Sequence, residues 1–185
     1  MTEASPVRGG EHARPRWSVA DLLTAARVPL AILFLVIGDP LVRLAIVVGA
    51  AATDLLDGRL ARRYGASTLG AVLDPVADKL FMASAFGVVA WSRDLAWYEV
   101  AAVLLRDIVA TVAFVITALS RRPRAIPARL GGKAVTVGQL LTLGAFLLDS
   151  PFLRPIAWAT AAVGLYAIWD YSQVAGREKR PLHYD

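Results

Sequence analysis

The sequence predicts an all-α integral membrane protein, a bundle of six transmembrane helices with both termini in the cytoplasm. Of its 185 residues, 57% are hydrophobic and only 19% are charged, and the mean hydropathy is +0.54. A soluble domain averages roughly 45–50% apolar and about 25% charged residues. The apolar residues form six long blocks, and the cations gather on one side of them. We expect one domain at 17–176, with polar tails at 1–16 and 177–185.

Composition also excludes several classes of protein. The apolar excess excludes a disordered chain, and the absence of cysteine excludes a disulfide framework, a thiolate zinc site and a cysteine nucleophile. The net charge of +5 is explained by membrane topology and anionic headgroups, so we expect membrane lipids and no nucleic acid as partners.

Each apolar block approaches the roughly 20 helical residues that cross a bilayer core. Leu, Ala and Val dominate the blocks, and Pro and Gly cluster at their ends, which favours helices over strands. The first block is too long for the apolar core of a signal peptide, so we expect it to be retained. The blocks are about Val19–Ile37, Leu41–Leu56, Leu69–Trp91, Leu95–Leu119, Ala134–Leu148 and Phe152–Val174.

The distribution of Lys and Arg predicts the orientation. Of the 20 such residues, 14 lie in the two tails and in the loops after the second and fourth blocks. The positive-inside rule places these segments in the cytoplasm.

Four aspartates lie at the cytoplasmic ends of the second and third blocks. Positions 54, 57, 58, 61 and 62 share one face of a helix, and positions 70, 74 and 78 share a face of the next. Because the loop between the two blocks is short, we expect antiparallel neighbours whose faces meet. The four acids are Asp54, Asp57, Asp74 and Asp78.

Carboxylates that converge in this way repel one another, and divalent cations such as Mg²⁺ or Mn²⁺ relieve the repulsion. Gly58 and Gly70 leave room for a bulky ligand, Ala61 keeps the helix surface low, and Arg62 can bind a phosphate. The sequence therefore predicts a metal site that handles a phosphoanhydride or a phosphodiester. The structural alternative is a set of interfacial acids paired with neighbouring arginines, but acids within membrane segments are usually functional.

This stretch resembles the signature of the CDP-alcohol phosphatidyltransferases, D-x2-D-G-x2-A-R-x8-G-x3-D-x3-D, and matches every named letter of it. Seven residues separate Arg62 from Gly70, where the family usually has eight. We expect this difference to alter the loop rather than the chemistry, because loops tolerate deletions.

The resemblance implies an enzyme that transfers a phosphatidyl group from CDP-diacylglycerol to an alcohol and releases CMP. It implies two Mg²⁺ or Mn²⁺ ions per active site, at the cytoplasmic face of a bacterial plasma membrane. The implied metal ligands are Asp54, Asp57, Asp74 and Asp78, with Asp78 also the catalytic general base. The implied donor-binding residues are Asp57, Gly58, Ala61, Arg62 and Gly70.

The first block adds a weaker resemblance. Asp21-x2-Thr24-x2-Arg27 is similar to the N-x2-T-x2-R start of many members, with Asp21 in place of asparagine. We expect Thr24 and Arg27 to line the donor pocket. The structural alternative is a helix cap with a snorkelling arginine.

Acceptor binding should depend on further cations. Arg106 lies in the middle of the fourth block, where an unpaired charge is expensive, so we expect it to hold an anionic acceptor. A structural pair with Asp107 is the alternative, although adjacent residues point in different directions around a helix. Arg129 and Lys133 are the other candidates, and positive-inside anchoring is their alternative.

The choice of acceptor follows from local resemblances. The Asp78-Lys79 stretch and Gly132-Lys133-x2-Thr136-x2-Gln139 resemble phosphatidylglycerophosphate synthases, whereas Arg106-Asp107 resembles cardiolipin synthases. We favour sn-glycerol 3-phosphate as the acceptor, then phosphatidylglycerol, then inositol phosphate.

Two further interpretations stay open. A small cation transporter is the alternative from another class, although transport favours acids near the bilayer midplane. Ala83 and Gly87 form a small-x3-small pair that suits either a helix contact or the interface of a homodimer.

Overall fold

A computed structural model of the chain describes residues 19–64, 70–119 and 130–177. Within these ranges the side chains at 19–23, 57–64, 70–75, 114, 117–119, 130 and 174–177 lie outside the description. The described residues form six helices and no strand, which confirms the all-α, six-helix prediction. The helices are α1 (Val19–Val36), α2 (Pro40–Tyr64), α3 (Gly70–Ser92), α4 (Trp97–Leu119), α5 (Leu130–Leu147) and α6 (Leu153–Arg177).

Helices α2 and α5 extend furthest beyond the apolar blocks that predicted them. Helix α2 continues from Leu56 to Tyr64, through the motif residues, and α5 begins at Leu130 rather than at Ala134. A helix does not need an unbroken run of apolar side chains. Leu, Ala and Arg all have high helix propensity, so the helix continues through a segment that mixes them. Over the part of the chain that the structure describes, no helix combines the length and the apolar character needed to span a membrane.

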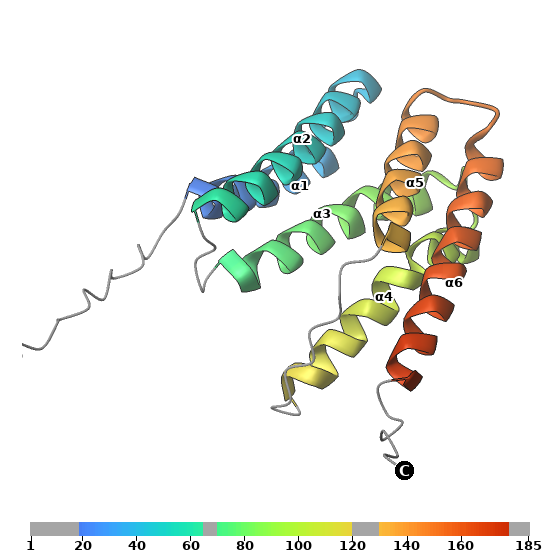
Figure 1. The fold of residues 1–185 in the computed structure, drawn as a ribbon. Coiled ribbons are helices and arrows are strands. Elements are labelled where there is room, and N and C mark those ends of the chain that lie inside the picture. The colour runs from blue at the N-terminus through green and yellow to red at the C-terminus, as the bar shows by residue number, and fades with distance from the viewer. Residues whose placement is uncertain (1–18, 65–69, 120–129, 178–185) are drawn as a thin grey trace, which may run out of the picture.

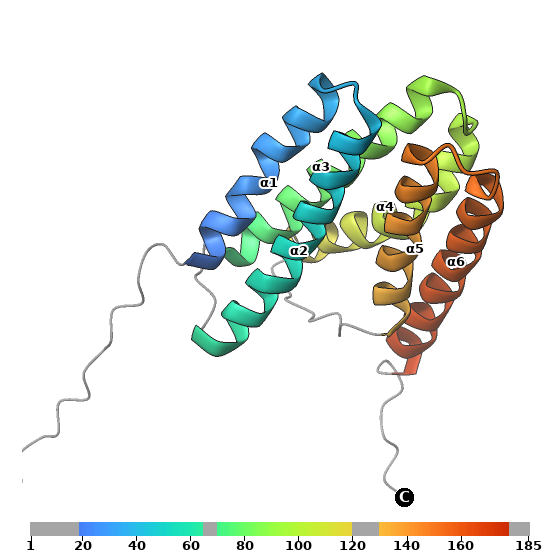
Figure 2. The same ribbon diagram turned by 90° about the horizontal axis from the view of Figure 1, so that it is seen from above.

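Successive helices run up and down, so that the connections gather at two ends of the bundle (Figures 1 and 2). The short connections at 37–39, 93–96 and 148–152 lie at one end, which is the upper side of Figure 2. Helix α1 packs most closely against α2 and α3, and α6 packs most closely against α4 and α5. Contacts between these two groups are fewer and join α2 to α5, and α3 to α4 and α5.

The apolar core lies toward the end with the short connections. Phe34, Phe86, Leu95 and Leu143 are completely buried there, and Phe34 meets Phe81 edge to face at a centroid distance of 6.1 Å. Burial of each such side chain stabilises the fold by roughly 1.5–3 kcal/mol. The core therefore fixes the helices at one end, and the motif residues lie at the other.

Helix α4 is fixed at its start by a buried acid. Glu99 is 5% exposed and accepts hydrogen bonds from the Ala96 backbone N–H at 2.8 Å and from the Trp158 Nε1–H at 3.1 Å. The first bond is one half of a capping box, and the second joins α4 to α6.

Helices α5 and α6 approach closely at a glycine. A Cβ added to Gly138 would lie 2.6 Å from Thr160 Oγ1 and 2.9 Å from its Cγ2. Thr160 cannot easily move away, because its hydroxyl donates to the Ile156 carbonyl at 2.8 Å. Glycine is thus required at this contact.

We expect Gly138→Ala to lower the free energy of unfolding by about 1–3 kcal/mol, because it overpacks this contact. Gly144→Ala in the same helix is the matched control, since a Cβ there would have nothing within 4 Å among the described residues. Thermal unfolding of the two purified variants would measure the difference. Equal midpoints for both would contradict the packing argument.

Candidate active site

The family motif spans the end of α2 and the start of α3, which lie at the end of the bundle opposite the apolar core (Figure 2). The structure describes the side chains of only Asp54 and Asp78 among the motif residues. The remaining motif side chains, which lie outside the description, are Asp57, Gly58, Ala61, Arg62, Gly70 and Asp74.

Asp54 is oriented by a buried arginine from the first helix. Arg27 Nη2 lies 2.9 Å from Asp54 Oδ1, with side-chain exposures of 2% for Arg27 and 50% for Asp54. Thr24 lies one turn before Arg27 and is completely buried. Arg27 therefore points into the bundle toward the motif, where the snorkelling alternative would have carried it outward.

Asp78 belongs to the same charged cluster. It is partly buried on α3, and the charges of Asp54, Arg27, Asp107 and Lys79 all act on it. Asp54 and Asp78 repel each other, and both act on a site that also holds Arg27. Over the described residues, α1 packs against both α2 and α3, so these two helices are not the close neighbours that the short loop predicts. Convergence of all four aspartates stays a prediction, because the other two side chains are not described.

Among the described residues, this cluster offers two carboxylates to a metal ion, those of Asp54 and Asp78. The described residues contain no group of three or more His, Cys, Asp or Glu side chains that could hold a metal ion. Two of the four predicted ligands, Asp57 and Asp74, lie outside that set. The donors that are described, one carboxylate on α2 and one on α3, are of the oxygen type that Mg²⁺ and Mn²⁺ prefer.

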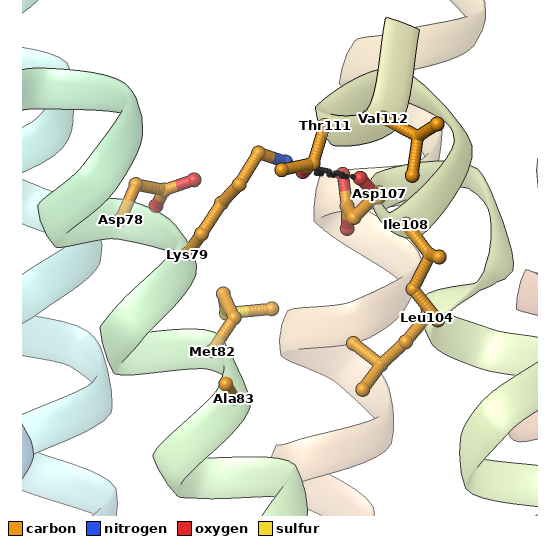
Figure 3. Close-up of a pocket in the computed structure, with 9 residues that line it drawn as sticks. All are labelled: Asp78, Lys79, Met82, Ala83, Leu104, Asp107, Ile108, Thr111 and Val112. Atoms are coloured by element: carbon orange, nitrogen blue, oxygen red, sulfur yellow. Dashed lines mark hydrogen bonds and ion pairs between the residues drawn. The ribbon is translucent and has the colours of Figure 1, made fainter. Parts of the chain in front are cut away.

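A pocket of about 290 Å³ opens between α3 and α4 next to Asp78 (Figure 3). In the close-up, Lys79 and Asp107 point toward each other across the space between the two helices. The other walls are largely apolar. A cavity with charged groups at one end and apolar walls suits an amphiphilic ligand. Its lining residues are Asp78, Lys79, Met82, Ala83, Leu104, Asp107, Ile108, Thr111 and Val112.

Arg106 pairs with its neighbour in the chain. Its Nη1 lies 2.7 Å from Asp107 Oδ1, so the expectation that these adjacent residues point apart is wrong. Its Nη2 lies 3.4 Å from the hydroxyl of Tyr171 on α6, and a Cβ added to Gly132 would lie 2.5 Å from Nη2. Because both side chains are only 20% exposed, Arg106 is a positioned cation within the bundle rather than a surface charge.

The other two acceptor candidates are Lys133 and Arg129. Lys133 is exposed on the first turn of α5, and Arg129 lies outside the described residues. Of the two described candidates, Arg106 lies within the bundle and Lys133 lies at its surface, and the acceptor role of each stays a prediction.

A family model for CDP-alcohol phosphatidyltransferase matches residues 17–169, which is most of the chain. The chain belongs to this family. This confirms the resemblance seen in the motif and makes the protein a transferase, an enzyme of phospholipid synthesis.

Several relatives of this CDP-alcohol phosphatidyltransferase carry more specific names. A probable phosphatidylglycerophosphate synthase of Mycobacterium tuberculosis is 36% identical over 176 residues, which cover 89% of this chain and 82% of the relative. A CDP-diacylglycerol–glycerol-3-phosphate 3-phosphatidyltransferase of Pectobacterium atrosepticum is 33% identical over 141 residues, covering 71% and 78%. A putative cardiolipin synthase of Mycobacterium bovis is 35% identical over 136 residues, covering 69% and 64%.

The structure of this phosphatidyltransferase adds residues to the site that sequence reasoning had not assigned. Lys79 and Asp107 line the pocket beside Asp78, and Gln139 of α5 donates to Asp107 Oδ2 at 2.6 Å. The signal in the sequence was present: all three are polar residues inside apolar blocks, where each needs a partner. Their pairing across three helices was not readable from spacing.

Proposed function

We propose that the enzyme transfers a phosphatidyl group from CDP-diacylglycerol to sn-glycerol 3-phosphate and releases CMP. The observation that carries this proposal is that two cations, Lys79 and Arg106, pair with Asp107, which lines the same pocket as the motif acid Asp78. Cations in a partly buried site favour an acceptor that carries a phosphate. The names of the relatives from Mycobacterium tuberculosis and Pectobacterium atrosepticum support the same acceptor.

The donor would bind at the motif. Thr24 and the motif residues Asp57, Gly58, Ala61, Arg62 and Gly70 would bind the CDP group. The carboxylates of Asp54, Asp57, Asp74 and Asp78 would hold two Mg²⁺ or Mn²⁺ ions, with Arg27 keeping Asp54 in place. Bound ions would neutralise the pyrophosphate and the departing CMP.

Asp78 would act as the general base. Its carboxylate takes the proton from the acceptor hydroxyl while that oxygen bonds to the phosphorus of the phosphatidyl group, and the phosphorus–oxygen bond to CMP breaks. Arg106, with Lys133 and Arg129, would hold the phosphate of the acceptor. The Arg106 Nε is buried and has no hydrogen-bond partner among the described residues, so a bound anion would be a suitable acceptor for it.

A second acceptor is favoured by the pocket. Its apolar walls beside Asp78 would suit a lipid alcohol such as phosphatidylglycerol, the acceptor of a cardiolipin synthase. The relative named a putative cardiolipin synthase supports this alternative.

The decisive experiment is an acceptor panel. Purified enzyme is supplied with CDP-diacylglycerol and Mg²⁺, and CMP release is measured with sn-glycerol 3-phosphate, phosphatidylglycerol and inositol phosphate in turn. We expect release to depend on sn-glycerol 3-phosphate. Release with phosphatidylglycerol alone would replace this function with cardiolipin synthesis, and cation uptake without CMP release would favour the transporter.

The bundle is proposed to lie in a bacterial plasma membrane with the motif end at the cytoplasmic face. This proposal is supported by large apolar side chains that are exposed on every helix, because bilayer lipids would cover them. One such residue from each helix, with its exposure, is Val36 (76%), Leu41 (69%), Val76 (61%), Ile116 (57%), Leu141 (58%) and Leu165 (57%).

The proposed orientation predicts a labelling pattern. Because the chain has no cysteine, single-cysteine variants report only the chosen position. We expect Asp94→Cys, between α3 and α4, to react with a membrane-impermeant maleimide added to spheroplasts, and His12→Cys to react only after permeabilisation. The reverse pattern would invert the proposed orientation.

The homodimer stays a proposal. Ala83 and Gly87 are both exposed on α3, and a Cβ at Gly87 would have nothing within 4 Å among the described residues. A surface of small residues of this kind lets a second helix approach closely.

A further inference from the structure

We propose that Asp107 is a positioning residue for acceptor binding. It holds Arg106 and Lys79 in the orientation that binds the acceptor phosphate, and Gln139 holds Asp107 in turn. The inference rests on the proposed function, because it assigns a role within the same acceptor site.

The carboxylate of Asp107 has a separate task for each oxygen. Oδ1 faces the cations, with Arg106 Nη1 at 2.7 Å and Lys79 Nζ at 3.6 Å. Oδ2 accepts the hydrogen bond from Gln139 Nε2 at 2.6 Å. Because each oxygen is held from a different side, the plane of the carboxylate is fixed.

Gln139 is suited to this supporting role. Its side chain is 2% exposed, and its amide nitrogen also donates to the Val103 carbonyl at 3.2 Å. A buried amide costs free energy unless its hydrogen bonds are made. Gln139 of α5 therefore binds both the α4 backbone and the Asp107 carboxylate. These two bonds fix the position of the carboxylate relative to α5.

The network joins four helices. Lys79 comes from α3, Asp107 from α4, Gln139 from α5, and Tyr171 from α6 contacts Arg106. Helices α3 and α4 otherwise make few contacts, and the Lys79–Asp107 pair bridges them beside the pocket (Figure 3). Since Lys79 follows Asp78 in the chain, Asp107 also links the helix of the general base to the residue that would bind the acceptor.

A purely electrostatic role for Asp107 and a positioning role predict opposite changes in the acceptor KM of Asp107→Asn. Lys79 and Arg106 carry two positive charges and Asp107 one negative charge, so Asp107→Asn raises the local charge by one. If Asp107 acted only through its charge, removal of that charge would strengthen phosphate binding and lower the acceptor KM. If it positions the cations, the same substitution weakens binding and raises the acceptor KM.

The experiment uses the purified full chain with CDP-diacylglycerol, Mg²⁺ and the acceptor that the wild type uses. We expect Asp107→Asn to raise the acceptor KM about tenfold, the effect of losing roughly one charge-assisted hydrogen bond. The KM for CDP-diacylglycerol should stay within about twofold of the wild-type value. Gln139→Met, which keeps the volume but removes the donor, should shift the acceptor KM in the same direction by a smaller factor.

Thr142→Val is the matched control. Thr142 is a buried polar residue of α5, as Gln139 is, but its hydroxyl donates to the Gly138 carbonyl at 2.8 Å and lies outside the pocket lining. We expect its acceptor KM to equal that of the wild type.

Three results would overturn the proposal: an unchanged acceptor KM in Asp107→Asn, a lowered one, or an equal rise in both KM values. If Asp107→Asn does not fold, Gln139→Met tests the proposal in its place. An unchanged acceptor KM in Gln139→Met would then reject the positioning role of Asp107. If the proposed function is wrong, the wild-type enzyme itself would not release CMP with sn-glycerol 3-phosphate, which is a different result. The positioning test would proceed with whichever acceptor supports CMP release.

Discussion

Replacing Asp78 by asparagine is expected to reduce CMP release by at least about a thousandfold. The amide cannot accept the hydroxyl proton, and loss of a general base costs about 10²–10⁴-fold. The substitution also removes one charge from the proposed metal ligands. Because asparagine has nearly the same size and Asp78 is only partly buried, the fold should remain intact.

The measurement is single-turnover CMP release, together with binding of a CDP ligand and the thermal midpoint of the purified variant. We expect turnover to be lost while nucleotide binding and the midpoint are retained. Asp94→Asn, an exposed acid at the opposite end of the bundle, is the control and should behave as the wild type. Normal turnover in Asp78→Asn would remove Asp78 as the base.

Replacing Arg106 by alanine should have the second-largest effect, about a 30–100-fold rise in the acceptor KM. A guanidinium that binds a phosphate contributes about 2–3 kcal/mol through charge-assisted hydrogen bonds, and each 1.4 kcal/mol is tenfold in affinity. The KM for CDP-diacylglycerol should change little. Arg154→Ala on α6, whose side chain is 66% exposed, is the matched control.

Steady-state kinetics with varied acceptor would measure this effect. An unchanged acceptor KM in Arg106→Ala would reject its role.

Gly132→Ala tests the same guanidinium without removing it. The added Cβ would lie 2.5 Å from Arg106 Nη2 and 3.0 Å from the Tyr171 hydroxyl. Because the end of an arginine side chain moves easily, we expect a stable protein with a shifted guanidinium and an acceptor KM raised by about tenfold. An acceptor KM equal to that of the wild type would show that the position of the guanidinium does not matter.

Local patterns in the sequence were sufficient to predict the six helices and the family. Six apolar blocks predicted six helices, since apolar runs of this length and composition have one regular conformation that satisfies their backbone groups. The motif predicted the family because its residues and their spacing resemble the family signature, and the family model that matches residues 17–169 confirms this. The helix ends were less predictable, and α2 runs eight residues past its apolar block, to Tyr64, since charged side chains do not end a helix.

The partners of the charged residues were less predictable. Arg106 and Asp107 were expected to point apart, yet a long arginine side chain can bend back to its neighbour when other groups hold both. Arg27 was assigned to the donor pocket or to the surface, and it lies buried against Asp54. Neither pairing follows from helical periodicity, because side-chain conformation depends on the helices packed around it.

The sequence by itself determined the helices, the location of the acidic motif and the membership of the family, because these depend on residue types and on spacing within one or two helices. The tertiary structure decided which charges meet. Only the packing of α3, α4, α5 and α6 brings Lys79, Asp107, Gln139 and Tyr171 into one network. Those residues are far apart in the chain, and their contacts are set by how the helices pack, which no local pattern encodes.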